Sequence, residues 1–300
     1  MLKIAYDPIY SHPLPAGHKF PMEKYDLLPR QLLYEGTANE ENFFRPEQIN
    51  PFWITRIHDQ NYWKALSSLT LGAREIRRIG FPLSEALINR ETLIASGTIA
   101  CSIQALENGI AMNIAGGTHH AFRDKGEGYC LLNDQAIAAN YLLENKLARQ
   151  ILIIDLDVHQ GNGTASIFYG NDQVFTFSMH GATNFPYHKE ISDLDLALPD
   201  GMGDQAYLDL LTKTLPALIS RVKPDFVFYL AGVDVLETDR LGKLALSRQG
   251  CRQRDLYTLS LCKKNDLPVV VCLGGGYSVR LTDIIEAHAN TFRVARDLYF

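Results

Sequence analysis

The feature that most constrains the fold is a series of short, almost wholly apolar runs separated by longer stretches with helical spacing. The runs are Leu2–Tyr6, Ala111–Ala115, Ile151–Leu156, Val174–Ser178, Phe226–Leu230 and Val269–Leu273. Apolar residues at nearly every position are typical of strands buried on both faces of a sheet. In the intervening stretches, such as 92–106, 136–142 and 207–219, apolar residues recur at helical spacing. This alternation predicts a parallel sheet with helices on both faces.

No Gly-, Ser- or Pro-rich linker, repeat or low-complexity tract interrupts the chain. We therefore expect one α/β domain over residues 1–300. Its three layers (α/β/α) would have a central, mostly parallel sheet as the middle layer. Residues 8–60 are the exception, because they are rich in proline and aromatic residues and only weakly periodic. We expect loops and short helices over the sheet there.

Composition excludes several classes of protein. The 300 residues are 46% hydrophobic and 21% charged, with a net charge of −5, which is too apolar for intrinsic disorder. There is no Lys/Arg block that would bind nucleic acid, and no run approaches the ~20 apolar residues of a membrane span. The five cysteines are odd in number and form no CxxC pair, which predicts a reduced, cytoplasmic protein.

Chemically reactive side chains follow four of the apolar runs. The segments that contain them are Gly116–His120, Asp155–His159, Ala231–Asp234 and Gly274–Tyr277. In open parallel sheets the ligand site lies beyond the carboxyl ends of the strands. Segments that are distant in the sequence are thus expected to meet at one site.

Asp155, Asp157 and His159 occupy alternate positions, which places them on one side of an extended chain. Two carboxylates and an imidazole at a strand end are costly unless a cation compensates them. Asp157, His159 and Asp234 would hold a divalent metal and leave a coordination position open. The alternative is an N-capping Asp and a surface His before a helix near residue 161, and Asp234 at an equivalent strand end weighs against it.

His119 and His120 follow two glycines, and two adjacent histidines are suited to general base and general acid catalysis. Surface His pairs are also common, so this pair alone is weak evidence. The 274–277 segment lacks the features of a phosphate-binding loop. Its Tyr277 is placed to donate to a developing oxyanion, or is simply a buried tyrosine at a tight turn.

Together these residues resemble the zinc-dependent histone deacetylase family of the arginase/deacetylase superfamily. The matching segments are 116–120, 128–130, 155–163, 231–234 and 275–277, in that order. Residues 12–22 and 234–242 look like the first loop and a later segment of the class IV branch. The resemblance implies the arginase/deacetylase fold.

The resemblance also implies a role for each matching residue. Zn²⁺ would be bound by Asp157, His159 and Asp234. His120 would be the general base, His119 its electrostatic partner and Tyr277 the group that polarises the amide carbonyl. Asp155 and Asn162 would orient the two histidines.

Two further sets of residues carry implied roles. A structural K⁺ would be bound by the Ser178 hydroxyl and by the carbonyls of Asp155, Asp157, His159 and Met179. The substrate tunnel would be lined by Gly128, Tyr129, Phe185 and Leu241. Ordinary packing remains the alternative for the two aromatic rings.

At three places the sequence differs from relatives of this family, and these differences narrow the predicted function. Gly161 and Leu236 stand where binuclear relatives carry carboxylates, which favours one metal ion. Leu241 replaces the gatekeeping Glu of polyamine deacetylases, which disfavours a polyamine substrate. No Asp lies at Phe81-Pro82, where many peptide deacetylases anchor the substrate backbone, so peptide selectivity stays open.

The predicted function is zinc-dependent hydrolysis that removes acetyl or longer acyl groups from the lysine side chain of a protein or peptide. A small-molecule amidohydrolase that acts on an acyl-amide metabolite is the first alternative. A non-catalytic module that binds acyl-lysine is the second.

Overall fold

The structure is a computed structural model that describes residues 1–300. Eight strands form one sheet in the order β2-β1-β3-β8-β7-β4-β5-β6, and every neighbouring pair is parallel. The strands are β1 (Lys3–Ala5), β2 (Phe43–Phe44), β3 (Ile110–Asn113), β4 (Ile151–Asp155), β5 (Val174–Gly181), β6 (Leu194–Leu198), β7 (Phe226–Leu230) and β8 (Val269–Cys272). The predicted parallel α/β sheet is confirmed.

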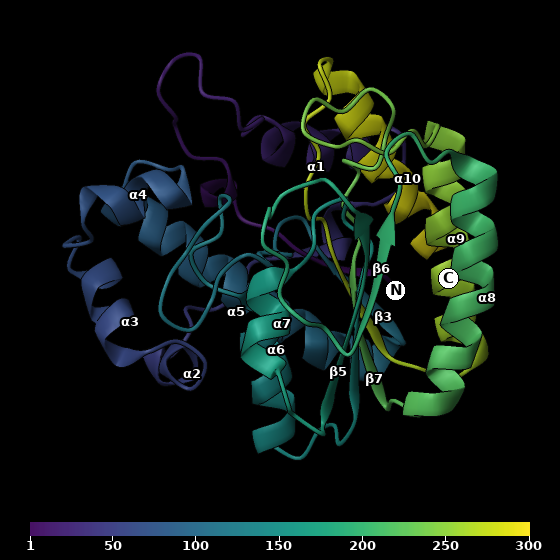
Figure 1. The fold of residues 1–300 in the computed structure, drawn as a ribbon, viewed down its shortest axis with the longest axis horizontal. Coiled ribbons are helices and arrows are strands. Elements are labelled where there is room, and N and C mark those ends of the chain that lie inside the picture. The colour runs from purple at the N-terminus through teal and green to yellow at the C-terminus, as the bar shows by residue number, and fades with distance from the viewer.

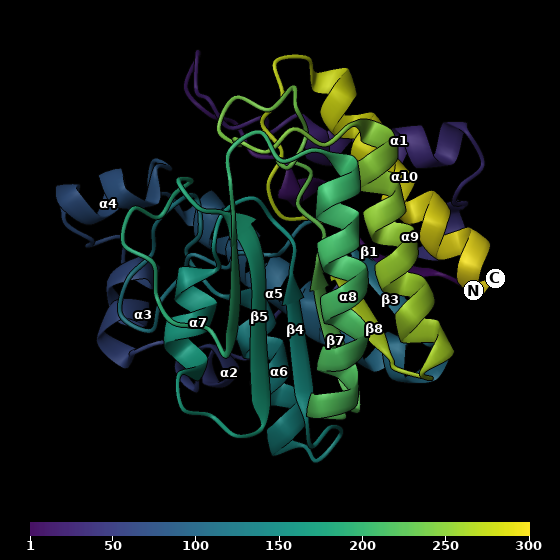
Figure 2. The ribbon, with the colours of Figure 1, turned by 45° about the vertical axis from the view of Figure 1, so that its right-hand side comes forward.

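Helices cover both faces of this sheet (Figure 1). The α-helices are α1 (Lys24–Tyr34), α2 (Pro51–Thr55), α3 (Gln60–Ser67), α4 (Ala73–Ile79), α5 (Glu85–Asn108), α6 (Asp134–Glu144), α7 (Asn162–Phe168), α8 (Asp204–Val222), α9 (Arg248–Lys264) and α10 (Leu281–Tyr299), and the 3₁₀ turns are η1 (Pro8–Tyr10) and η2 (Glu40–Asn42). Helices α8, α9 and α10 run along one face, and α5 and α6 pack against the other (Figure 2). The result is the predicted three-layer arrangement.

The centre of the sheet differs from its edges. Every residue of β3, β4, β7 and β8 is buried, as the apolar runs predicted. The sequence did not predict β2 and β6, which form the two edges of the sheet and are mostly half-buried. A strand with one partner and a partly wet face needs no continuous apolar run.

The 8–60 region is more ordered than expected. It contains the predicted loops and short helices, but also strand β2 and the 11-residue helix α1. Helix α1 packs on α10 from the other end of the chain. Its stability therefore comes from a tertiary contact rather than from strong periodicity.

The longest helix, α5, leads directly to the site. The Ser84 side chain caps its start by accepting from the Leu87 N–H, and Gly109 ends it in the left-handed conformation. Strand β3 begins at the next residue and leads into the 116–120 segment. Although α5 has 24 residues, neither it nor any other helix combines the length and apolarity needed to cross a bilayer.

Candidate active site

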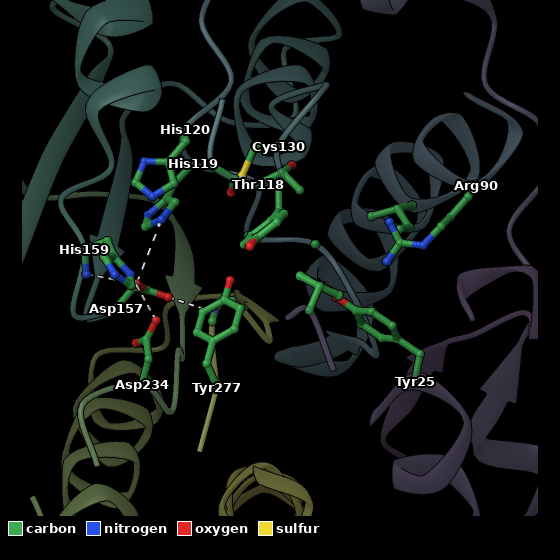
Figure 3. Close-up of a pocket in the computed structure, with 18 residues that line it drawn as sticks. Tyr25, Arg90, Thr118, His119, His120, Cys130, Asp157, His159, Asp234 and Tyr277 are labelled. Carbon is green, nitrogen blue, oxygen red and sulfur yellow. Dashed lines mark hydrogen bonds and ion pairs between the residues drawn. The ribbon is translucent and has the colours of Figure 1, made fainter. Parts of the chain in front are cut away.

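Four loops meet at the carboxyl end of the sheet. They follow β3, β8, β7 and β4, which are consecutive neighbours in the sheet. Each loop carries one of the segments predicted to contribute to a site. Figure 3 shows their side chains around one pocket.

Asp157, His159 and Asp234 converge on one point. Nδ1 of His159 lies 3.1 Å from Oδ1 of Asp157 and 3.1 Å from Oδ2 of Asp234. One ligand atom from each residue lies within 4.8 Å of the others, and all three side chains are buried. Ligands about 2.0–2.1 Å from a tetrahedral Zn²⁺ lie about 3.3 Å apart, so this donor set fits such an ion.

The pKa of His159 also indicates that this cluster favours a cation. Burial lowers the pKa of His159, but the hydrogen bonds to Asp157 and Asp234 outweigh burial and raise that pKa to about 10. The two acidic side chains thus favour a positive charge between them, which compensates their own. A divalent cation would do so more completely.

The backbone holds both carboxylates in place. The Val158 N–H donates to Oδ1 of Asp234 at 3.0 Å, and the Gly275 N–H donates to Oδ2 of Asp157 at 2.8 Å. A Cβ at position 275 would collide with the Asp234 carboxylate. The glycines after β8 thus allow the backbone to approach the two carboxylates closely.

The two histidines have different orienting partners. Nδ1 of His119 lies 2.7 Å from Oδ2 of Asp155, and Nδ1 of His120 lies 2.6 Å from Oδ1 of Asn162. The two imidazole rings lie side by side, with centroids 4.1 Å apart. The structure thus brings together the pairs that the sequence analysis expected.

These environments move the two pKa values apart. Burial lowers the pKa of His119, but Asp155 and Asp157 outweigh burial and raise it. Burial and the nearby positive charges of His119 and His159 hold the pKa of His120 well below its usual value. Such a separation is typical of an acid–base pair.

Tyr277 lies across the pocket from the histidines (Figure 3), with its ring centroid 6.5 Å from that of His159. Burial and the carboxylates of Asp234 and Asp157 raise the pKa of Tyr277 well above its usual value, so the hydroxyl keeps its proton. A neutral hydroxyl is the form that can donate a hydrogen bond to an oxyanion.

The residues that hold Tyr277 carry no recognisable signal in the sequence. Its backbone N–H donates to Oδ2 of Asp239 at 2.6 Å, and its carbonyl accepts from Nε of Arg240 at 2.9 Å. Buried Lys24 donates to the Gly274 carbonyl at 3.0 Å. No pattern in the sequence links Asp239, Arg240 or Lys24 to Tyr277.

The four expected tunnel residues line one pocket of about 540 Å³. They are Gly128, Tyr129, Phe185 and Leu241. The Phe185 ring stands edge-on to His120, with a centroid distance of 4.9 Å. The Tyr129 ring lies 6.1 Å from that of Tyr277. The pocket therefore leads from the surface to the histidines and the tyrosine.

A smaller cavity of about 40 Å³ lies on the inner side of the site. Besides the site residues, it is lined by Phe20, Tyr25, Arg90 and Ile94, which sequence reasoning did not single out. Figure 3 shows Arg90 and Tyr25 on the opposite side of Tyr277 from the cluster of Asp157, His159 and Asp234. These residues come from α1, α5 and the 8–23 segment, whose placement only the tertiary structure shows.

Ser178 and Met179, the expected K⁺ ligands, are buried in β5. Ser178 is paired in register with Asp155 of β4. The Ser178 hydroxyl contacts Nδ1 of His180 at 2.9 Å. The K⁺ site stays a prediction.

Comparison with known proteins identifies the family. The histone deacetylase domain matches residues 18–292, which is most of the chain. The protein belongs to the histone deacetylase family. Its similarity to the HDA15 HD domain, with a TM-score of 0.81 over 99% of this chain and 90% of that one, confirms the fold at 20% identity.

Relatives of this histone deacetylase family member come from distant organisms. It is 46% identical to an uncharacterized protein of Picosynechococcus sp. over 99% of both chains. It is 27% identical to histone deacetylase 2 of Arabidopsis thaliana, over 87% of this chain and 70% of the relative. Identity to human histone deacetylase 1 is also 27%, and the match spans only 58% of that longer protein.

Proposed function

We propose that this protein is a zinc-dependent deacetylase that hydrolyses the acetyl amide of a lysine side chain in a protein or peptide. The observation that carries the proposal is the convergence of two carboxylates on His159 Nδ1, each at 3.1 Å, beside two oriented histidines in one pocket. This combination provides a metal site, a base and an acid within reach of one amide group.

Asp157, His159 and Asp234 would hold the Zn²⁺. When bound, such an ion polarises a carbonyl group and makes water more acidic. Three protein ligands leave the open position that is typical of a catalytic site. We also propose that K⁺ binds near Ser178 and Met179, where it would stabilise the loop that carries the zinc ligands.

His120 would act as the general base. Its Nδ1 is engaged by Asn162, so Nε2 is the nitrogen left to accept a proton from the attacking water. The lowered pKa of His120 keeps that nitrogen unprotonated at neutral pH. The same nitrogen would return the proton to the leaving lysine amine, while His119, paired with Asp155, supplies a stabilising charge.

Tyr277 would stabilise the tetrahedral oxyanion. Its protonated hydroxyl faces the pocket, and its backbone is held on both sides by Asp239 and Arg240. A donor that is positioned before the reaction needs no reorganisation as charge develops.

The size of the inner cavity favours an acetyl group. A cavity needs roughly 10–15 Å³ to hold one water molecule, so 40 Å³ holds about three water-sized groups. An acetyl group has three non-hydrogen atoms, whereas a fatty acyl chain has many more. A long acyl chain would have to displace Phe20, Tyr25 or Ile94 from their packed positions.

The pocket mouth disfavours polyamines. Arg77 and Arg78 are exposed there without an ion-pair partner, and Leu241 is 38% exposed at the rim. A polyamine cation would meet two positive charges there, and the carboxylate in the pocket lining, Glu127, already accepts from Asn162.

The decisive experiment measures zinc content and then hydrolysis of acetyl-, trifluoroacetyl- and myristoyl-lysine peptides against acetylpolyamines. We expect one zinc ion per chain and faster turnover of the acetyl-lysine peptide than of the myristoyl-lysine peptide, with Asp157→Asn inactive. Turnover of acetylpolyamines alone would support a small-molecule amidohydrolase. Bound zinc without hydrolysis of any substrate would support a binding module.

A further inference from the structure

Asn162 bridges His120 to a carboxylate. Its Oδ1 lies 2.6 Å from Nδ1 of His120, and its Nδ2 donates to Oε1 of Glu127 at 2.6 Å. Asn162 and His120 are buried, whereas Glu127 is half-buried and lines the pocket mouth. The mechanism above makes no use of Glu127.

The chemistry of the three groups fixes the direction of both hydrogen bonds. A carboxylate only accepts, so the amide end of Asn162 that faces Glu127 must be the NH₂ group. The oxygen of Asn162 must then face His120, and an oxygen can only accept. The proton of the neutral His120 ring therefore lies on Nδ1, which leaves a lone pair on Nε2.

Without Glu127, this arrangement would not be unique. Asn162 could turn its amide over and donate to Nδ1 of His120, because a side-chain amide has a donor end and an acceptor end. The ring proton would then lie on Nε2, and that nitrogen could not take a proton from water. An ionised Asp at position 162 has only acceptor oxygens, so it could not donate to Nδ1 of His120.

The backbone around Glu127 is shaped for this contact. The Cys130 N–H donates to the Glu127 carbonyl at 2.9 Å, and both central residues of this turn have positive φ, +56° at Gly128 and +67° at Tyr129. A Cβ at Gly128 would lie 2.6 Å from Cδ2 of His120. The turn thus packs on the His120 ring, with Glu127 beside it, and non-glycine strain of this kind is found at functional sites.

We propose that Glu127 is a positioning residue for catalysis: its carboxylate orients the Asn162 amide and thereby keeps His120 in the tautomer that can act as a base. This inference rests on the proposed deacetylase function. His119 is oriented by a carboxylate directly, through Asp155, and His120 is oriented by one through an amide.

The test compares the zinc-loaded wild type with Glu127→Gln, Asn162→Asp and the double variant. A glutamine at position 127 can present either end of its amide, so we expect kcat to fall about 10-fold with KM within about 2-fold, a typical loss for an outer-shell partner. Asn162→Asp alone places a second carboxylate next to that of Glu127, with no donor between them, and should also lose activity. The double variant gives His120 a carboxylate to which the introduced glutamine can donate, so kcat should return to within about 3-fold of wild type.

Rescue by the second substitution separates orientation from a general structural role. A loss of fold stability at position 127 would not be repaired by a change at position 162. Glu190→Gln, at an exposed carboxyl beyond the pocket lining, is the matched control and should behave as wild type. A wild-type kcat for Glu127→Gln, or a double variant no better than the worse single one, would refute the role of Glu127.

A second measurement does not depend on turnover. Nitrogen-15 NMR of labelled histidines distinguishes the Nδ1–H and Nε2–H tautomers, with His120 assigned from a His120→Gln spectrum. We expect the Nδ1–H form in the wild type and a mixture in Glu127→Gln. An unchanged tautomer would refute the inference, whereas a changed tautomer in a protein that hydrolyses no acyl-lysine would refute only the proposed function.

Discussion

Oδ2 of Asp239 accepts a 2.6 Å hydrogen bond from the backbone N–H of Tyr277. The other carboxylate oxygen accepts from the N–H groups of Leu241 and Gly242, each at 2.8 Å. One side chain thus joins the turn at the pocket rim to the residue that would stabilise the oxyanion. The position of the Tyr277 hydroxyl depends on this contact.

Asp239→Asn should therefore impair catalysis without unfolding the protein. Asn has one acceptor oxygen and cannot satisfy N–H groups on both sides, so Tyr277 should shift and kcat should fall about 10–100-fold. Steady-state kinetics check this. Tyr277→Phe, which should cost about 10²–10³ in kcat, is the reference, and adding Asp239→Asn to it should cause little further loss. If the two substitutions instead lowered kcat by independent factors that multiply, Asp239 would not act through Tyr277.

Removing one of the proposed zinc ligands should abolish zinc binding. Asp234→Asn keeps the shape but not the charge of the side chain, so we expect less than one zinc ion per chain after dialysis, measured by elemental analysis. Excess zinc should stabilise the wild type, by about 2.7 kcal/mol at 100 times the Kd, and should leave Asp234→Asn unchanged. The exposed Asp172→Asn variant is the control, and equal zinc content in all three proteins would exclude the proposed site.

His58 should make the protein less stable in mild acid. Burial lowers its pKa to about 4. Nδ1 donates to the Phe122 carbonyl at 2.8 Å, and Nε2 accepts from the Asn133 N–H at 3.0 Å. The unfolded chain, with a His pKa of about 6.5, takes up a proton between pH 6.5 and 4 that the folded protein excludes. This contribution to stability is therefore lost as the pH falls through that range.

The expected size of this effect is about 2 kcal/mol between pH 7 and pH 5. Urea unfolding of the wild type and of His58→Gln at both pH values measures it, because Gln does not titrate. The stability advantage of the wild type over His58→Gln should shrink by that amount at pH 5. An advantage that does not change with pH would show that His58 is not the group responsible.

The arginines at the mouth should select the sequence around the acetyl-lysine. Arg77 and Arg78 are exposed and unpaired at the end of α4, so peptides with Asp beside the acetyl-lysine should have a kcat/KM about 5-fold higher than peptides with Lys there. Arg77→Gln/Arg78→Gln should remove this preference, as should 1 M salt, where the Debye length is about 3 Å.

Arg74→Gln is the matched control, because Arg74 lies on the same helix but outside the pocket lining. Its preference should equal that of the wild type. A charge preference that survives in the double Arg77/Arg78 variant would place the selecting charge elsewhere.

Enlarging the inner cavity should broaden acyl selectivity. Ile94 lines it, and Ile94→Ala should raise the rate for butyryl-lysine relative to acetyl-lysine, at a cost in stability of about 2–5 kcal/mol. Competition assays with the two peptides measure the ratio. Leu93→Ala, at a buried neighbour on α5 outside the cavity, should lose similar stability and leave the ratio unchanged. A change of this ratio in both variants would show a general loosening of the packing and not an effect of cavity size.

The sequence by itself determined the centre of the fold. Central strands such as Ile151–Asp155 and Phe226–Leu230 are buried on both faces, so each carries its own signal as a local apolar run. Because parallel strands end at the same edge of a sheet, the residues that follow them, such as Asp157 and Asp234, were also expected to meet.

Only the tertiary structure decided how those residues are held. Glu127 meets Asn162 across 35 positions of the chain, and Asp239 meets Tyr277 across 38. Neither contact is signalled by a periodic pattern in the sequence, because each depends on how two irregular loops fold over one sheet edge. Sequence periodicity reports which face of an element is buried, whereas the orientation of a catalytic side chain depends on contacts that form only when distant loops are brought together.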